Sequence, residues 1–122
     1  MRILVKRVYE EPAKSDGLRV LVDRLWPRGM TKEKAKVDAW WKELAPSSAL
    51  RKWFGHEPAK WEEFQKRYFK ELDSNPAVAD FLARYQEQAV VTLLYGAKDE
   101  KHNQALLLQI YLKDKIALGP TG

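Results

Sequence analysis

The chain has 122 residues, of which 45% are hydrophobic and 11% aromatic, enough for one folded domain with a single core. It contains no cysteine, which excludes disulfides, thiolate catalysis and cysteine-ligated metals and agrees with a reducing cytoplasm. The net charge of +5 comes from residues 1–54, which hold 13 Lys/Arg against 7 Asp/Glu, whereas residues 55–122 hold 9 against 10. Such a basic half favours an anionic partner, although it equally suits a solvated surface.

No targeting or membrane segment is predicted. The first residues lead directly into a short strand pattern, which is too short for the apolar region of a signal peptide. No apolar run approaches the ~20 residues of a membrane span. We therefore expect a cytoplasmic protein with no membrane attachment.

Two strands are predicted in the first 25 residues. Alternation over residues 3–9 predicts the first, and the Val- and Leu-rich residues 18–25 predict a second, buried on both faces. The connection between them ends in the turn signal Asp16-Gly17 and is short for a parallel crossover. The two strands are therefore either antiparallel or joined by an unusually compact link.

Short elements follow. Thr31 is expected to cap a short helix that ends at residue 35. Alternation over residues 37–44 favours a third strand. In such a strand Trp40 and Trp41 point to opposite faces, which makes one of them a candidate pocket wall.

Three helices are predicted in the middle of the chain, because their apolar residues recur every three or four positions. The first has its cap at Ser47 or Ser48, and Gly55 ends it. The other two begin near Pro58 and Pro76, since proline suits the first turn of a helix.

The last part of the chain holds one strand and one helix. The continuous apolar run over residues 89–95 predicts a central strand, residues 96–101 a loop, and residues 103–115 a helix. Four side chains of this helix are expected to face the core: Leu106, Leu107, Ile110 and Tyr111.

Together these elements predict an α/β fold. We expect a single three-layer domain over residues 1–116, with about four strands in a mixed or mostly parallel sheet flanked by helices. Residues 117–122 are expected to form a flexible C-terminal tail.

The first candidate site lies in residues 20–29, where the second strand ends, because ligand-binding groups of α/β proteins collect at strand ends. The guanidinium groups of Arg24 and Arg28 suit phosphate or carboxylate, and Trp26 offers a flat face to a ring or cation. Alternation places Arg24 and Asp23 on opposite faces of the strand. The competing interpretation is structural, with Asp23 paired to a neighbouring arginine and Trp26 packed at the edge of the core.

The second candidate segment, residues 96–103, joins the central strand to the last helix. In this arrangement backbone N–H groups and the helix dipole can hold an anion. Lys98 adds a positive charge, whereas Asp99 and Asn103 either orient a ligand or simply cap the helix. Arg51, one turn into its helix, is a further candidate for the same cleft.

No metal site or cofactor is expected. His56 and His102 are the only histidines, and they lack the spacing of metal ligands, so surface or helix-end roles are predicted for both. Whether the protein is an enzyme stays open. Asp23 and Asp99 are the candidate acid/base groups, but no proton-transfer partner can be assigned to either.

Several motifs of the chain resemble the YeaO-like proteins, which contain domain of unknown function 488. They are Asp16-Gly17, residues 19–29, Ala45-Pro46-Ser47, residues 50–56, and residues 92–99 with Asn103. The resemblance covers residues 2–116 and implies a small cytoplasmic α/β domain with a central sheet between helices. It implies no established activity. More distant relatives place cysteines near the last strand and helix, where this chain has Tyr95 and His102-Asn103-Gln104, so their thiol chemistry does not carry over.

Three functions are compatible with these observations. The first is a basic pocket at the strand ends that binds a small anionic ligand bearing phosphate or carboxylate. Its ligand-binding residues would be Arg24, Trp26, Arg28, Arg51, Lys98 and Asn103. The alternative is a nucleic-acid-binding or regulatory protein that uses the basic N-terminal half, with an affinity that falls steeply with salt. A third is an adaptor that presents an apolar surface to another protein.

Overall fold

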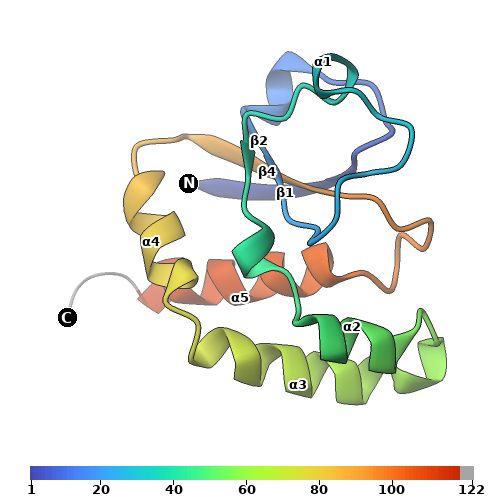
Figure 1. Ribbon diagram of the computed structural model, residues 1–122. Helices are drawn as coiled ribbons and strands as arrows, with labels where there is room; N and C mark the ends of the chain where they lie inside the picture. The colour runs from blue at the N-terminus through green and yellow to red at the C-terminus, as the bar shows by residue number, and fades with distance from the viewer. Residues whose placement is uncertain (119–122) are drawn as a thin grey trace.

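The computed structural model describes residues 1–118 and contains one sheet of four parallel strands with helices packed on it (Figure 1). The predicted α/β class is confirmed, and the sheet is entirely parallel. Its strand order is β1-β4-β2-β3. The strands are β1 (Arg2–Arg7), β2 (Leu18–Leu21), β3 (Ala39–Trp40) and β4 (Val90–Tyr95).

The compact link between the first two strands is the correct alternative. Because β4 lies between β1 and β2, these two strands are parallel without being neighbours. The link contains one short 3-10 helix, η1 (Lys14–Asp16), and then Gly17 with φ 63°. A Cβ at residue 17 would overlap the carbonyl oxygen of Val90, so only glycine allows the link to pass this close to β4.

Two of the predicted strands are too long. β2 ends at Leu21, and although the N–H of Val22 still donates to the carbonyl of Leu94 (3.0 Å), the chain then turns so that Asp23 meets the end of β4. β3 has only two residues because a 3-10 helix, η2 (Lys42–Leu44), follows at once. In both segments the sequence pattern typical of a strand continues after the backbone has stopped pairing with a neighbouring strand, so the pattern overestimates the length of the strand.

The helices are distributed unevenly between the two faces of the sheet (Figure 1). Four of them lie on one face, and only the short α1 (Lys32–Ala35) lies on the other. The four are α2 (Ser48–Phe54), α3 (Trp61–Asp73), α4 (Ala77–Arg84) and α5 (Gln104–Leu118). A 3-10 turn, η3 (Pro58–Lys60), leads into α3.

The predicted helix caps are confirmed. The Thr31 hydroxyl accepts a hydrogen bond from the N–H of Lys34 (3.1 Å), and the Ser47 hydroxyl accepts one from the N–H of Leu50 (3.1 Å). Gly55 ends α2 with φ 55°, a conformation that favours glycine.

The face of α5 differs from the prediction. Leu107 and Tyr111 are buried as expected, but Leu106 is only partly buried and Ile110 is 47% exposed. The helix packs on β1 and β4, and Leu108 and Leu112 are the fully buried residues of its face instead. The helix also continues to Leu118, so residues 117–118 of the predicted tail are helical. Residues 119–122 of that tail lie outside the described residues.

The thinly covered face of the sheet is sealed by a buried ionic cluster. The Asp16 carboxylate accepts from the Arg19 guanidinium (2.5 Å) and from the Lys6 ammonium (3.2 Å), and Arg19 also donates to the carbonyl of Ala35 in α1 (2.7 Å). Burial alone would raise the pKa of Asp16, but hydrogen bonds from the N–H of Ala13, Lys6 and Arg19 hold it below its ordinary value. Two of the basic residues in the N-terminal half are therefore used inside the fold.

No helix within residues 1–118 is both long enough and apolar enough to cross a membrane.

Candidate functional site

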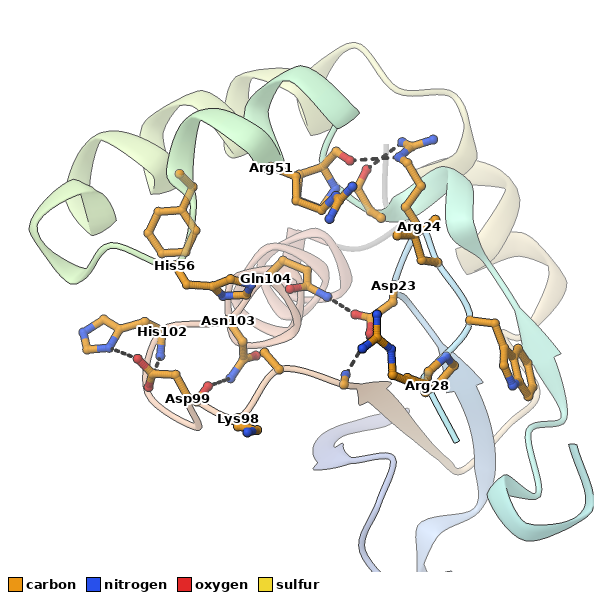
Figure 2. A pocket seen from close by; sticks show the side chains of 18 of the residues that line it. Asp23, Arg24, Arg28, Arg51, His56, Lys98, Asp99, His102, Asn103 and Gln104 are labelled. Atoms are coloured by element: carbon orange, nitrogen blue, oxygen red, sulfur yellow. Dashed lines mark hydrogen bonds and ion pairs between the residues drawn. The ribbon is translucent and has the colours of Figure 1, made fainter. Parts of the chain in front are cut away.

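A cavity of about 710 Å³ opens at the carboxyl ends of β2 and β4, bordered by α2 and the start of α5 (Figure 2). Most of its lining comes from three separate parts of the chain: the loop after β2, the residues around α2, and the segment from the end of β4 to the start of α5. Tyr9 after β1 and Phe64 of α3 complete it. The eight candidate acid/base and ligand-binding residues all lie in its lining: Asp23, Arg24, Trp26, Arg28, Arg51, Lys98, Asp99 and Asn103. The segments that carry them thus meet in one place.

Asp23 joins the loops that border the pocket. Its carboxylate accepts a hydrogen bond from the N–H of Gly96 (2.8 Å) and another from the side-chain amide of Gln104. Burial raises the pKa of Asp23, although these hydrogen bonds and the nearby charges of Arg51 and His56 act in the opposite direction. The competing structural interpretation, in which Asp23 pairs with Arg19 or Arg24, is not supported, because Asp23 forms no ion pair within residues 1–118.

Arg24 is fixed by backbone carbonyls instead of a carboxylate. Its Nε donates to the carbonyl of Pro46 (3.1 Å) and its Nη2 to the carbonyl of Ala45 (3.3 Å). Since the strand has already ended at Leu21, Arg24 is placed by the following loop and not by strand alternation. The guanidinium is held in one orientation, and no carboxylate among the described residues forms an ion pair with it.

The other cations of the pocket are also unpaired. Arg28, Arg51 and Lys98 are exposed, and within residues 1–118 neither they nor Arg24 form an ion pair. Figure 2 shows Arg24 and Arg51 on the side of α2 and Lys98 on the opposite side of the cavity. The rim of the pocket therefore carries a positive charge that no carboxylate at ion-pairing distance offsets.

Trp26 supports the loop after β2. Its indole N–H donates to the carbonyl of Met30 (2.7 Å), and its ring meets Trp40 edge-on with centroids 5.5 Å apart. Neither Trp40 nor Trp41 lines the pocket, so the expectation of a pocket wall at one of them is wrong. Trp41 packs instead against Phe81 in the core, and the Trp40 N–H holds the carbonyl of Asp23 (2.7 Å).

Of the two side chains expected to cap the last helix, Asn103 accepts from an N–H of α5, whereas Asp99 accepts from N–H groups of the turn that precedes the helix. The Asp99 carboxylate accepts from the N–H groups of Lys101 (2.9 Å) and His102 (3.1 Å), and from the His102 ring (2.8 Å). These hydrogen bonds, that of the Lys101 N–H first among them, hold the pKa of Asp99 below its ordinary value.

Asn103 is buried and its amide is occupied on both sides. Its oxygen accepts from the N–H of Leu106 (3.1 Å) and its nitrogen donates to the carbonyl of Asp99 (3.1 Å). Because the chain's own side chains take these N–H groups, an anion in the pocket would be held mainly by side chains. Asn103 shapes the loop that carries Lys98.

Sequence reasoning missed several residues of the site. His56 and His102 both line the pocket, where only surface or helix-end roles were expected, and so do Gln104 and Tyr9. A usable signal was that His56 directly follows the helix-ending Gly55; it has φ 58° and lies at the mouth of the pocket. Nothing in the sequence marked Gln104 as the partner of Asp23.

The end of β1 ties the two pocket loops together. The Tyr9 hydroxyl donates to the carbonyl of Arg28 (2.8 Å), and the Arg7 Nε donates to the carbonyl of Ala97 (2.9 Å). The Arg7 guanidinium lies 4.9 Å from the centre of the Tyr9 ring, so the two residues support each other.

No group of three His, Asp or Glu side chains that could hold a metal ion occurs in the part of the chain that the structure describes. The pocket chemistry present is that of guanidinium, ammonium and imidazole groups around a half-buried carboxylate.

These features define a small parallel α/β domain with a cationic pocket where its central strands end. The family comparison is consistent with them. Residues 2–119 match the family model described as the inactive DUF488-N3 subclade, and the chain belongs to this DUF488 family.

The chain is similar to curated proteins along most of its length. It is 42% identical over 113 residues to Uncharacterized protein YeaO of Escherichia coli K12, which covers 93% of this chain and 98% of that protein. It is 40% identical over 107 residues to Uncharacterized protein Rv3073c of Mycobacterium tuberculosis H37Rv, covering 88% and 90% respectively. No solved structure gives a significant match.

Proposed function

We propose that the protein binds a small anionic ligand, bearing phosphate or carboxylate, in the pocket at the ends of β2 and β4. The observation that carries this proposal is that Arg24, Arg28, Arg51 and Lys98 line one cavity and none of them forms an ion pair within residues 1–118. Guanidinium groups recognise oxyanions through paired N–H donors, and a partly buried one without a counter-ion gains most from such a ligand. The ligand would supply the missing negative charge.

We further propose that this is binding without catalysis, in the cytoplasm. The family description calls the subclade inactive. The pocket lining contains no Ser, Thr or Cys among the described residues, so the usual hydroxyl and thiol nucleophiles are missing from it. Asp23 and Asp99 already accept hydrogen bonds that fix them in place, which suits a scaffold better than proton transfer.

The test is calorimetric titration with sulfate, phosphate and acetate at low ionic strength. The wild type is compared with the triple variant Arg28→Gln, Arg51→Gln, Lys98→Gln. A control triple variant, Lys52→Gln, Lys66→Gln, Lys113→Gln, removes the same charge from exposed residues outside the pocket.

We expect the wild type and the control triple variant to bind one of these anions with similar affinity, and the pocket variant to lose about tenfold or more. An equal loss of affinity in both triple variants would mean that anion binding depends on the net charge of the protein and not on the pocket. Absence of binding to all three anions would overturn the proposal.

Nucleic-acid binding is the second candidate, and one observation favours it. Four exposed lysines lie on two short helices that Arg19 connects: Lys14 on η1 and Lys32, Lys34 and Lys36 at or beside α1. If these lysines contact phosphates, the logarithm of the binding constant for a DNA or RNA duplex falls linearly with the logarithm of the salt concentration. Replacing all four by Gln should then make the slope of this line shallower by about 3 to 4. A gel-shift series without any complex at low salt would dismiss this function.

A further inference from the structure

The pocket is larger and more apolar than the binding of a bare inorganic anion requires. This inference rests on the proposed function and concerns the ligand's body, not its charge. From the lining we infer that the ligand is a ring-bearing anion: an aromatic or heteroaromatic molecule that carries its acidic group on one side and a hydrogen-bond donor on the other.

The size of the cavity is the first reason. Its volume of about 710 Å³ lies within the range of sites that enclose whole small molecules, roughly 300–1,000 Å³. A phosphate or sulfate ion held by the cationic rim would leave most of that space to water.

The apolar wall is the second reason. Phe54 of α2 and Phe64 of α3 are stacked, with centroids 4.3 Å apart and planes 25° from parallel, and both line the cavity. Ala45, Pro46 and Ala97 extend this wall. Phe54 and Phe64 are only 5% and 2% exposed, so they present a small area to the cavity together with the neighbouring apolar residues. An apolar group of the ligand displaces water from that area favourably, and a flat ring fits such a wall.

The buried carboxylate is the third reason. Each oxygen of Asp23 accepts one hydrogen bond, from Gly96 or from Gln104, and retains a further lone pair. In its charged form Asp23 repels the acidic group of the ligand, so that group belongs at the cationic rim of the pocket and not beside the carboxylate. The part of the ligand near Asp23 is therefore a donor such as an N–H or O–H.

Matched pairs of ligands test the ring requirement on the unmodified protein. Adenosine 5′-monophosphate is compared with ribose 5-phosphate, which has the same phosphate and sugar but no aromatic ring. Then 4-aminobenzoate is compared with acetate, which shares only the carboxylate. The two pairs also distinguish a phosphate source of the charge from a carboxylate source.

In at least one pair we expect the ring-bearing member to bind about tenfold tighter or more, with a more negative heat-capacity change of binding. In the Phe54→Leu variant, the difference in affinity between the two members of the pair should be smaller. Its thermal unfolding transition is measured first, to establish that the variant is folded. Arg24→Gln should weaken both members of the pair by a similar factor.

The outcomes separate the two proposals. If the aromatic and non-aromatic anions bind equally in both pairs, the ring inference is wrong while anion binding stands. If no member of either pair binds and sulfate and phosphate also fail, both proposals are wrong. If only the ring-bearing members bind, and their binding is lost in the triple variant of Arg28, Arg51 and Lys98, both proposals are supported.

Discussion

Asp23 accepts a hydrogen bond from the backbone N–H of Gly96 at 2.8 Å, which joins the chain just after β2 to the chain just after β4. These two segments are more than 70 positions apart in the sequence, and both border the pocket. The bond therefore fixes the relative positions of the loops that carry Arg24 and Lys98.

Replacing Gly96 by alanine should disturb this joint. A Cβ at residue 96 would lie 3.0 Å from the Asp23 carboxylate, closer than side chains normally pack, so the carboxylate must shift. We expect a loss of about 1 to 3 kcal/mol in the free energy of unfolding, measured by urea denaturation. In an Asp23→Ala background the same change should cost much less, because the two effects act through one contact. Additive losses in the double variant would show that Gly96 acts independently of Asp23.

Asp23→Asn should strengthen the binding of sulfate, an anion without hydrogen-bond donors. Burial raises the pKa of Asp23, and in its charged form the carboxylate opposes an anion bound in the pocket. Removing that charge should tighten sulfate binding about fivefold in calorimetry at low salt, and the gain should shrink as salt rises. Unchanged sulfate affinity would place the anion beyond the reach of Asp23.

The same variant gives a stability test with a defined sign. Because the folded-state pKa of Asp23 is raised, its contribution to stability is fully present below the ordinary aspartate pKa and is lost as pH rises through the folded value. As pH rises from the ordinary aspartate pKa through the folded-state pKa, the free energy of unfolding of the wild type should therefore fall relative to that of Asp23→Asn. If the wild type instead becomes more stable relative to Asp23→Asn as pH rises, the folded-state pKa of Asp23 is not raised by burial.

Asp16→Ala should be strongly destabilising. It leaves the buried Arg19 without its partner, and breaking a buried pair typically costs about 3 to 5 kcal/mol. Glu63→Ala is the matched control, because it removes an exposed pair with Arg67 and should cost less than about 1 kcal/mol. Since the pKa of Asp16 is lowered, the advantage of the wild type should be lost as pH falls below the ordinary value of 3.8. Equal losses from both substitutions would refute the role of the ionic cluster.

Gly17 and Gly29 separate backbone conformation from close contact. Both have positive φ, 63° and 77°, but a Cβ at residue 17 would overlap the Val90 carbonyl, whereas one at residue 29 would meet no atom within 4 Å. Gly29→Ala should cost about 1 kcal/mol, the price of the left-handed conformation. Gly17→Ala should cost about 3 kcal/mol or more in thermal or urea unfolding. Similar losses at the two positions would mean that the link between β1 and β2 can move away from β4.

Local rules in the sequence were sufficient for much of the fold. The caps at Thr31 and Ser47, the end of α2 at Gly55 and the central position of β4 follow from side-chain chemistry within a few residues. The ends of β2 and β3 do not, because they depend on where neighbouring strands stop pairing. The exposure of Ile110 likewise reflects which side of α5 meets the sheet, a matter of tertiary packing.

For the site, the chemistry of single residues was enough to predict the basic side chains of the pocket. It did not predict the residues that fix the loops carrying them. Arginines beside a strand end were informative, and Arg24, Arg28 and Arg51 line the pocket together with Lys98. The contacts of Gln104 with Asp23 and of Tyr9 with the Arg28 carbonyl span long sequence separations and leave no local pattern. Such partners are visible only once the chain is folded.

The central claim is that the pocket cations share one anion, and crystals soaked in selenate test it most directly, because anomalous scattering locates each selenium atom. We predict a selenate in the cavity at hydrogen-bonding distance from the Arg24 guanidinium and at least one of Arg28, Arg51 and Lys98. An empty pocket in crystals where selenate occupies other lysines, such as those of α1, would contradict the account.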